Sequence, residues 1–114
     1  KRLLETAKKN NVIGVDEIQF FGDAIYQTIK QINQAGTDSL FIVSGLDMDY
    51  SGEPFGIMPK MMAIADEVTK LHAVCERCFC QATASYRVSN EKEQVIIGGK
   101  DRYKALCWKC ANEN

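Results

Sequence analysis

The sequence predicts an α/β core built on a parallel sheet, followed by a small β-rich module. Two short apolar runs, residues 12–15 and 40–43, flank a segment with helical spacing, which is typical of a strand–helix–strand unit. Beyond residue 72 the helical pattern gives way to short β-rich stretches, and all five cysteines lie there. We therefore expect residues 1–71 to form the core and residues 72–114 to form a separate module.

Each element of the core has its own signal. Residues 1–10 resemble a polar helix, and residues 12–15 form an apolar run typical of a parallel strand buried on both faces. Asp23 is expected to cap a helix that ends at Ala35-Gly36. The buried positions of this helix are expected to be Ile25, Ile29 and Ile32.

A loop rich in Gly and Asp is expected over residues 47–58, and Pro59 predicts the first turn of a second helix. The buried face of that helix is expected to consist of Met61, Ile64, Ala65, Val68 and Leu71. The β-rich stretches of the module are residues 81–89, 93–98 and 102–106, with a turn at Gly98-Gly99.

Composition excludes several classes of protein. Hydrophobic residues make up 46% of the 114 residues, and the formal net charge is -1, so no global basic field recruits nucleic acid. No apolar run approaches the roughly 18 residues of a membrane span, and no signal peptide is visible. The chain also begins without Met, which leads us to expect a fragment of a longer protein.

Four of the cysteines form two Cys-x-x-Cys pairs, which is the spacing of a zinc site with four thiolate ligands. Four protein ligands close the coordination shell, so such a zinc is expected to be structural. A redox or disulfide pair and a cluster of buried thiols are the alternatives. Cys80 is the spare and is expected to be a small buried side chain, and His72 a surface residue. The expected ligands are Cys75, Cys78, Cys107 and Cys110.

Asp16 and Glu17 follow the first apolar strand directly. In open α/β sheets, ligands bind beyond the carboxyl ends of the strands, where one acid can hold Mg²⁺ and another can act as a general base. Two solvated carboxylates that open a helix are the alternative. The sequence contains no Gly-x-x-x-x-Gly-Lys-Ser/Thr motif, so the phosphate cradle that such a role needs would lie upstream.

Four motifs resemble those of the type II (thymidine kinase-1-like) deoxynucleoside kinases. They are VIGVDEIQFF at residues 12–21, GLD with PFG at residues 45–56, LHAVCERC at residues 71–78, and IGGKDRYKALCWKC at residues 97–110. The resemblance implies a P-loop-NTPase-like (RecA-like) core fragment, without its P-loop segment, followed by a zinc ribbon with a "lasso" loop over the nucleoside. It also implies transfer of the γ-phosphoryl group of ATP to the 5′-hydroxyl of thymidine.

The resemblance implies residue roles. Glu17 matches the general base and Asp16 the acid on the Mg²⁺–ATP side. The positions that match substrate-binding residues are Gln19, Phe20, Leu46, Tyr50 and Phe55 in the core motifs, and Ser85, Ile96, Gly98 and Tyr103 in the lasso. Tyr50 stands where the family commonly has Phe.

The same resemblance implies a cytoplasmic homotetramer for pyrimidine salvage, with thymidine and ATP as substrates and dTTP as feedback inhibitor. We expect neither a nucleic-acid nor a membrane partner. An inactive structural fragment of such a kinase is one alternative. A zinc-ribbon module that binds nucleic acid is another, but acidic residues interleave the basic ones of the module.

Overall fold

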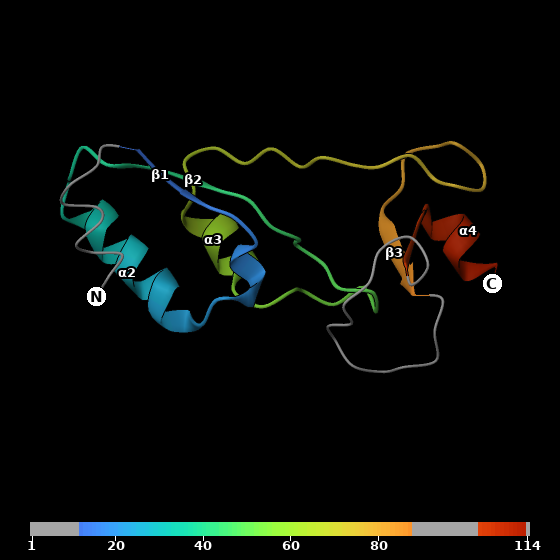
Figure 1. Ribbon diagram of the computed structural model, residues 1–114, viewed down its shortest axis with the longest axis horizontal. Coiled ribbons are helices and arrows are strands. Elements are labelled where there is room, and N and C mark those ends of the chain that lie inside the picture. The colour runs from blue at the N-terminus through green and yellow to red at the C-terminus, as the bar shows by residue number, and fades with distance from the viewer. Residues whose placement is uncertain (1–11, 88–102, 114) are drawn as a thin grey trace. The chain divides into compact units, whose positions relative to one another are not determined.

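The computed structural model describes residues 12–87 and 103–113. The elements in chain order are β1 (Val12–Val15), the 3-10 helix η1 (Ile18–Phe20), α2 (Asp23–Gln34), β2 (Leu40–Val43), α3 (Met58–Ile64), β3 (Ala84–Arg87), β4 (Tyr103–Leu106) and α4 (Trp108–Asn112) (Figure 1). The chain divides into two compact units. The first comprises the chain through Asp47 together with Pro54–Val68, and the second comprises Met48–Glu53 and the chain from Thr69 onward.

The first unit contains the predicted strand–helix–strand. β1 and β2 pair in parallel, with Val12 opposite Leu40 and Val15 opposite Val43, and α2 lies between them in the sequence (Figure 1). The mixed α/β class and the parallel pairing are therefore confirmed. The core of this unit consists of Ile18, Ile29, Ile57 and Met61, with partly buried hydrophobic side chains packed around it.

Burial of residues 12–15 on both faces was the wrong expectation for the described residues, and β2 is likewise exposed on one face. Ile13 is buried and Phe41 is half-buried, whereas their neighbours Val12, Leu40 and Ile42 are 58%, 55% and 59% exposed. Successive side chains of a strand point to opposite faces. In the part of the chain that the structure describes, the apolar core covers the face that carries Ile13 and Phe41.

The start of α2 differs from the prediction by one residue. Gly22 is the N-cap in extended conformation, and Asp23 is the first helical residue, so the capping role predicted for Asp23 is wrong. The carboxylate instead accepts a hydrogen bond from Lys60 Nζ at 2.7 Å. The predicted end is confirmed, because Ala35 is the C-cap and Gly36 follows with a φ of 68°.

The second predicted helix is shorter than expected. Pro59 lies in the first turn of α3 as predicted, but the helix ends at Ile64 because Ala65 takes an extended conformation with ψ 140°. Val68 and Leu71 lie outside any helix and are 47% and 89% exposed, so their assignment to a buried face was wrong.

The second unit contains a separate antiparallel pair. β3 pairs with β4, with Ala84 opposite Leu106 and Arg87 opposite Tyr103, and α4 follows β4 directly. These strands fall within the predicted stretches 81–89 and 102–106, while the stretch 93–98 lies outside the described residues. The core of this unit consists of Cys75, Ala82, Leu106 and Cys110. Among the described helices, none has the length and apolar character needed to cross a membrane.

Candidate functional site

The loops after β1 and β2 bring three polar residues together. The Ser44 backbone N–H donates to the Val15 carbonyl at 3.0 Å, which continues the parallel ladder past both strands. Ser44 Oγ then donates to Asp16 Oδ1 at 2.5 Å, and the Glu17 backbone N–H donates to the same oxygen at 2.9 Å. Carboxylate and hydroxyl oxygens are the donors that Mg²⁺ prefers, so Asp16 and Ser44 fit a magnesium ion.

Glu17 follows Asp16 in an unusual backbone conformation. Its φ of 55° and ψ of 43° lie in the left-handed region, which a residue with a Cβ rarely adopts. Its Oε2 accepts a hydrogen bond from Gln19 Nε2 at 2.7 Å. Gln19 is 3% exposed, and its Oε1 accepts from the Leu46 backbone N–H at 3.1 Å. The carboxylate of Glu17 is thus tied to the loop that follows β2.

Predicted pocket residues of the first unit also meet. The rings of Phe20 and Phe55 pack edge to face, with centroids 5.5 Å apart and planes at 88°. Phe55 is buried, whereas Phe20 and Leu46 are about half exposed, at 54% and 51%. Exposed aromatic and aliphatic surface of this kind can pack against a flat ring.

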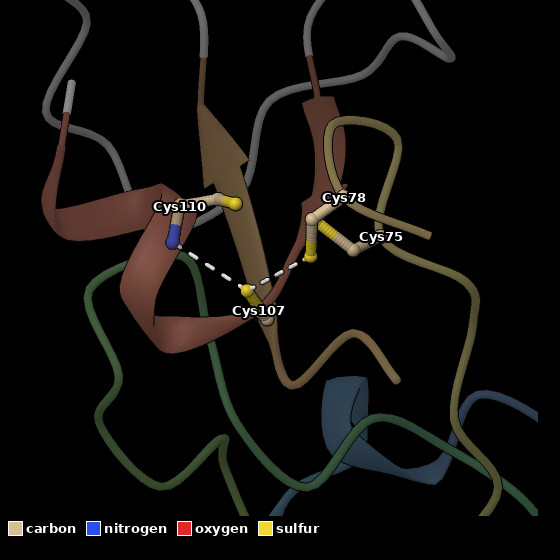
Figure 2. A group of neighbouring side chains, drawn as sticks. All are labelled: Cys75, Cys78, Cys107 and Cys110. Atoms are coloured by element: carbon tan, nitrogen blue, oxygen red, sulfur yellow. Dashed lines mark hydrogen bonds between the residues drawn. The ribbon is translucent and has the colours of Figure 1, made fainter. Parts of the chain in front are cut away.

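The second unit brings the four predicted cysteine ligands together (Figure 2). The Sγ atoms of Cys75, Cys78, Cys107 and Cys110 all lie within 4.8 Å of one another, and those of Cys78 and Cys107 are 3.6 Å apart. Zinc–sulfur bonds of about 2.3 Å in a tetrahedron require sulfurs roughly 3.8 Å apart. The four sulfurs therefore fit one zinc ion.

Local structure places each sulfur. Cys107 is the N-cap of α4, and its Sγ accepts from the Cys110 backbone N–H at 3.5 Å. The Cys78 backbone N–H, with those of Cys107 and Arg77, outweighs burial and lowers the pKa of Cys75 to about 6. Burial, together with the neighbouring cysteines, raises the pKa of Cys110 to about 12. Backbone N–H donors aimed at sulfur are suited to the thiolate form that binds metal.

Three residues predicted to bind substrate lie in the second unit, namely the lasso residues Ser85 and Tyr103 and the core-motif residue Tyr50. Ser85 is on β3 opposite Ala105, Tyr103 begins β4, and Tyr50 lies in the segment Met48–Glu53. The guanidinium carbon of Arg87 is 3.5 Å from the centroid of the Tyr50 ring, and Arg87 Nη2 donates to Tyr103 Oη at 3.0 Å. Arg87 thus joins two predicted substrate-side tyrosines. Ile96 and Gly98, also predicted to bind substrate, lie outside the described residues.

Comparison with known proteins decides the family. The sequence profile of the family described as thymidine kinase matches residues 2–111. The chain belongs to the thymidine kinase family. It is 42% identical over 113 residues to a thymidine kinase of Coprothermobacter proteolyticus, which covers 94% of this chain and 56% of that protein.

Two further relatives give similar values. A thymidine kinase of Bacteroides thetaiotaomicron is 43% identical over 100 residues, covering 88% of this chain and 49% of the relative. A thymidine kinase of Mycoplasma mobile is 44% identical over 98 residues, covering 86% of this chain and 48% of the relative. The chain therefore spans about half the length of the curated relatives it matches, and the family resemblance drawn from the sequence motifs is confirmed.

Two minor predictions near the cysteine cluster had different outcomes in this thymidine kinase family member. Cys80 is exposed, so the expectation of a small buried side chain was wrong. Its backbone carbonyl closes the turn by accepting from the Cys75 N–H at 2.7 Å, so the residue serves the turn through its backbone. His72 is exposed, as predicted, and is not among the clustered ligands of the described residues.

Two residues beside the predicted sites were missed from the sequence. Ser44 was detectable, because parallel pairing of residues 12–15 with 40–43 places the first residue after one strand beside the first residue after the other. Arg87 carried no such signal, because its contact with Tyr50 joins segments far apart in the sequence.

Proposed function

We propose that this chain carries the nucleoside-side half of a thymidine kinase, which transfers the γ-phosphoryl group of ATP to the 5′-hydroxyl of thymidine. The observation that carries the proposal is the position of Asp16 and Glu17 directly after β1, with Asp16 hydrogen-bonded to Ser44 directly after the parallel strand β2. Family membership supports the same reaction and substrates.

In this proposal Glu17 is the general base that removes the proton of the 5′-hydroxyl. Asp16, with Ser44 beside it, holds Mg²⁺ on the ATP side, and Mg²⁺–ATP supplies the phosphoryl group when bound. The family resemblance places the nucleoside against the core residues Gln19, Phe20, Leu46, Tyr50 and Phe55 and the lasso residues Ser85, Ile96, Gly98 and Tyr103.

The proposal extends to the architecture. Residues 1–71 act as part of a P-loop-NTPase-like core, and residues 72–114 act as a zinc-bound lasso module. A structural zinc on the four cysteines fixes the base of the lasso and takes no part in the chemistry. The complete protein is proposed to be a cytoplasmic homotetramer that serves thymidine salvage and is inhibited by dTTP, as the family resemblance implies.

The test of the reaction uses the complete gene product with labelled thymidine and Mg²⁺–ATP. Glu17→Gln is expected to lower kcat about 100- to 10,000-fold while thymidine KM changes little, because the carboxylate acts in the transition state. Glu67→Gln, at an exposed position after α3, is the matched control and should leave kcat unchanged. If the unmodified protein forms no thymidine 5′-phosphate in this assay, the result would favour the alternative that the chain belongs to an inactive structural fragment.

The zinc proposal is tested by metal analysis of the same protein. One zinc per chain is expected, and Cys107→Ser should lower that content and raise thymidine KM. Cys80→Ser is the matched control, because Cys80 is exposed and outside the cluster. Full zinc content and unchanged kinetics in Cys107→Ser would contradict the proposal.

A further inference from the structure

The side chain of Gln19 is buried between two groups that fix its orientation. Its Oε1 accepts from the Leu46 backbone N–H at 3.1 Å, and its Nε2 donates to Glu17 Oε2 at 2.7 Å. A backbone N–H can only donate and an ionised carboxylate can only accept. The two contacts therefore determine which end of the amide is oxygen and which is nitrogen, and a flipped amide would lose both.

Two glycines leave room for Gln19, one beside its side chain and one beside its backbone. A Cβ at Gly45 would overlap Gln19 Oε1, and a Cβ at Gly56 would overlap the Gln19 backbone carbonyl. Gly56 also has a φ of 53°, in the region that favours glycine. Two loops, one after β2 and one before α3, are thus fitted around Gln19.

Glu17, which accepts the hydrogen bond from this amide, has a backbone conformation that depends on neighbouring contacts. Glu17 takes a left-handed backbone conformation, which is strained for a non-glycine residue and persists only where neighbouring contacts fix it. The backbone N–H of Glu17 bonds to Asp16 Oδ1, and its side chain bonds to Gln19. A hydrogen bond to Oε2 fixes the plane of the carboxylate and hence the direction from which Oε1 meets a proton.

We propose that Gln19 is a positioning residue, which holds the Glu17 carboxylate in the orientation needed to take the proton of the substrate hydroxyl. The inference rests on the proposed role of Glu17 as general base. It deepens that role by linking the base to Leu46, whose own side chain is predicted to line the nucleoside pocket. In this proposal Gln19 contributes to catalysis through Glu17, in addition to its predicted place at the edge of the nucleoside pocket. A role of Gln19 in thymidine binding alone is the competing outcome.

The test compares Gln19→Met and Glu17→Gln in the complete gene product, singly and combined. Gln19→Met keeps the length of the buried side chain and removes both hydrogen bonds, the one to Glu17 and the one from the Leu46 N–H. We expect kcat to fall about 10- to 100-fold, because misplacing a reacting group by about 1 Å costs up to that factor, while thymidine KM changes less than about threefold. In the Glu17→Gln background, Gln19→Met should cause no further loss of kcat, since the base it positions is gone.

The outcomes separate this inference from the proposed function. Unchanged kcat in Gln19→Met beside a large loss in Glu17→Gln overturns the positioning role alone. Unchanged kcat in Glu17→Gln overturns the proposed base and the inference with it. A raised thymidine KM with normal kcat in Gln19→Met, or a further loss of kcat in the double variant, assigns Gln19 to the substrate or to the fold.

A second variant covers the case in which Gln19→Met does not fold. Gln19→Glu has almost the same volume and keeps an oxygen for the Leu46 N–H, but it places a carboxylate against that of Glu17. The same fall in kcat with little change in thymidine KM is expected, and a folded Gln19→Glu with normal kcat overturns the proposal.

Discussion

The two units of the molecule differ in the side chains that form their cores. Among its described residues, the first unit has a core of apolar side chains, namely Ile18, Ile29, Ile57 and Met61. Among the described residues of the second unit, two of the four core residues are cysteines, Cys75 and Cys110, beside Ala82 and Leu106. Burial of apolar side chains stabilises the first unit directly. Because the described residues of the second unit bury little hydrocarbon, we expect the stability of this unit to depend on a metal bound by its thiols.

This contrast follows from the amount of structure available to each unit. The described part of the second unit has two strands of four residues and one helix of five. Such small assemblies rarely fold on apolar burial alone, and a structural metal is one of the usual supplements. The first unit has a helix of 12 residues, α2, whose Ile29 lies in the core and whose Ile25 packs against it. We expect the units to respond differently to the same kinds of perturbation.

Metal removal should give the largest difference in stability between the two units. Zinc bound by four thiolates contributes an apparent free energy on the order of 10–16 kcal/mol in small domains, so a chelator should unfold the second unit. Amide hydrogen exchange would then lose protection in β3 and β4 while β1 and β2 keep theirs. Cys110→Ser should reproduce this result, and Cys80→Ser should not. Equal loss of protection in both strand pairs would contradict separate sources of stability.

A substitution that creates a cavity in the core of the first unit should destabilise that unit and leave the second unit unchanged. Ile29 is 1% exposed in the apolar core, so Ile29→Ala should lower the free energy of unfolding of this unit by about 2–5 kcal/mol. Ile42→Ala is the matched control, because Ile42 is 59% exposed and its truncation should change the free energy by at most about 0.5 kcal/mol. Hydrogen exchange in β1 and β2, measured as a function of denaturant, gives the change in free energy of unfolding for each substitution. Equal changes for the two substitutions would mean that Ile29 does not belong to the core of this unit.

A smaller effect is expected at the buried arginine of the second unit. Arg87 is 6% exposed, lies over the Tyr50 ring and donates to Tyr103 Oη. Arg87→Met keeps much of the stem but removes the cation–π contact and the hydrogen bond, which together are worth about 1–3 kcal/mol. Lys104→Met, at an exposed position of β4, is the matched control. Thermal unfolding of the zinc-bound protein should separate the two variants, and equal melting temperatures would show that the Arg87 contacts contribute nothing measurable.

The same two units show what the sequence could predict. The apolar runs predicted both strands of the parallel pair, because a strand can be recognised from the pattern of a few consecutive residues. The spacing of the cysteines predicted all four members of the cluster. The second helix was predicted too long because Val68 and Leu71 continue a helical spacing that the chain does not follow after Ala65. The hydrogen bonds of Gln19 and the stacking of Arg87 depend on loops that meet only in three dimensions, so local pattern could not reveal them.

The smallest effect is expected at the exposed ion pair between α2 and α3 in the first unit. The hydrogen bond from Lys60, and then that from Gln27, lowers the pKa of Asp23 below its ordinary value of 3.8. A group with a lowered pKa in the folded state stabilises it above the unfolded pKa, and this contribution is lost as pH falls through the folded pKa. Asp23→Asn should therefore lower the melting temperature slightly at pH 7, and the difference should vanish at pH values well below 3.8.

Both partners of this pair are about half exposed, so water and salt screen their attraction. The pH 7 difference should therefore shrink as salt is added, which the cavity in Ile29→Ala should not do. Asp38→Asn, at an exposed position before β2, is the matched control and should leave the melting temperature at pH 7 nearly unchanged. A melting-temperature difference for Asp23→Asn that persists in acid would mean that its helix position, rather than its charge, stabilises the first unit.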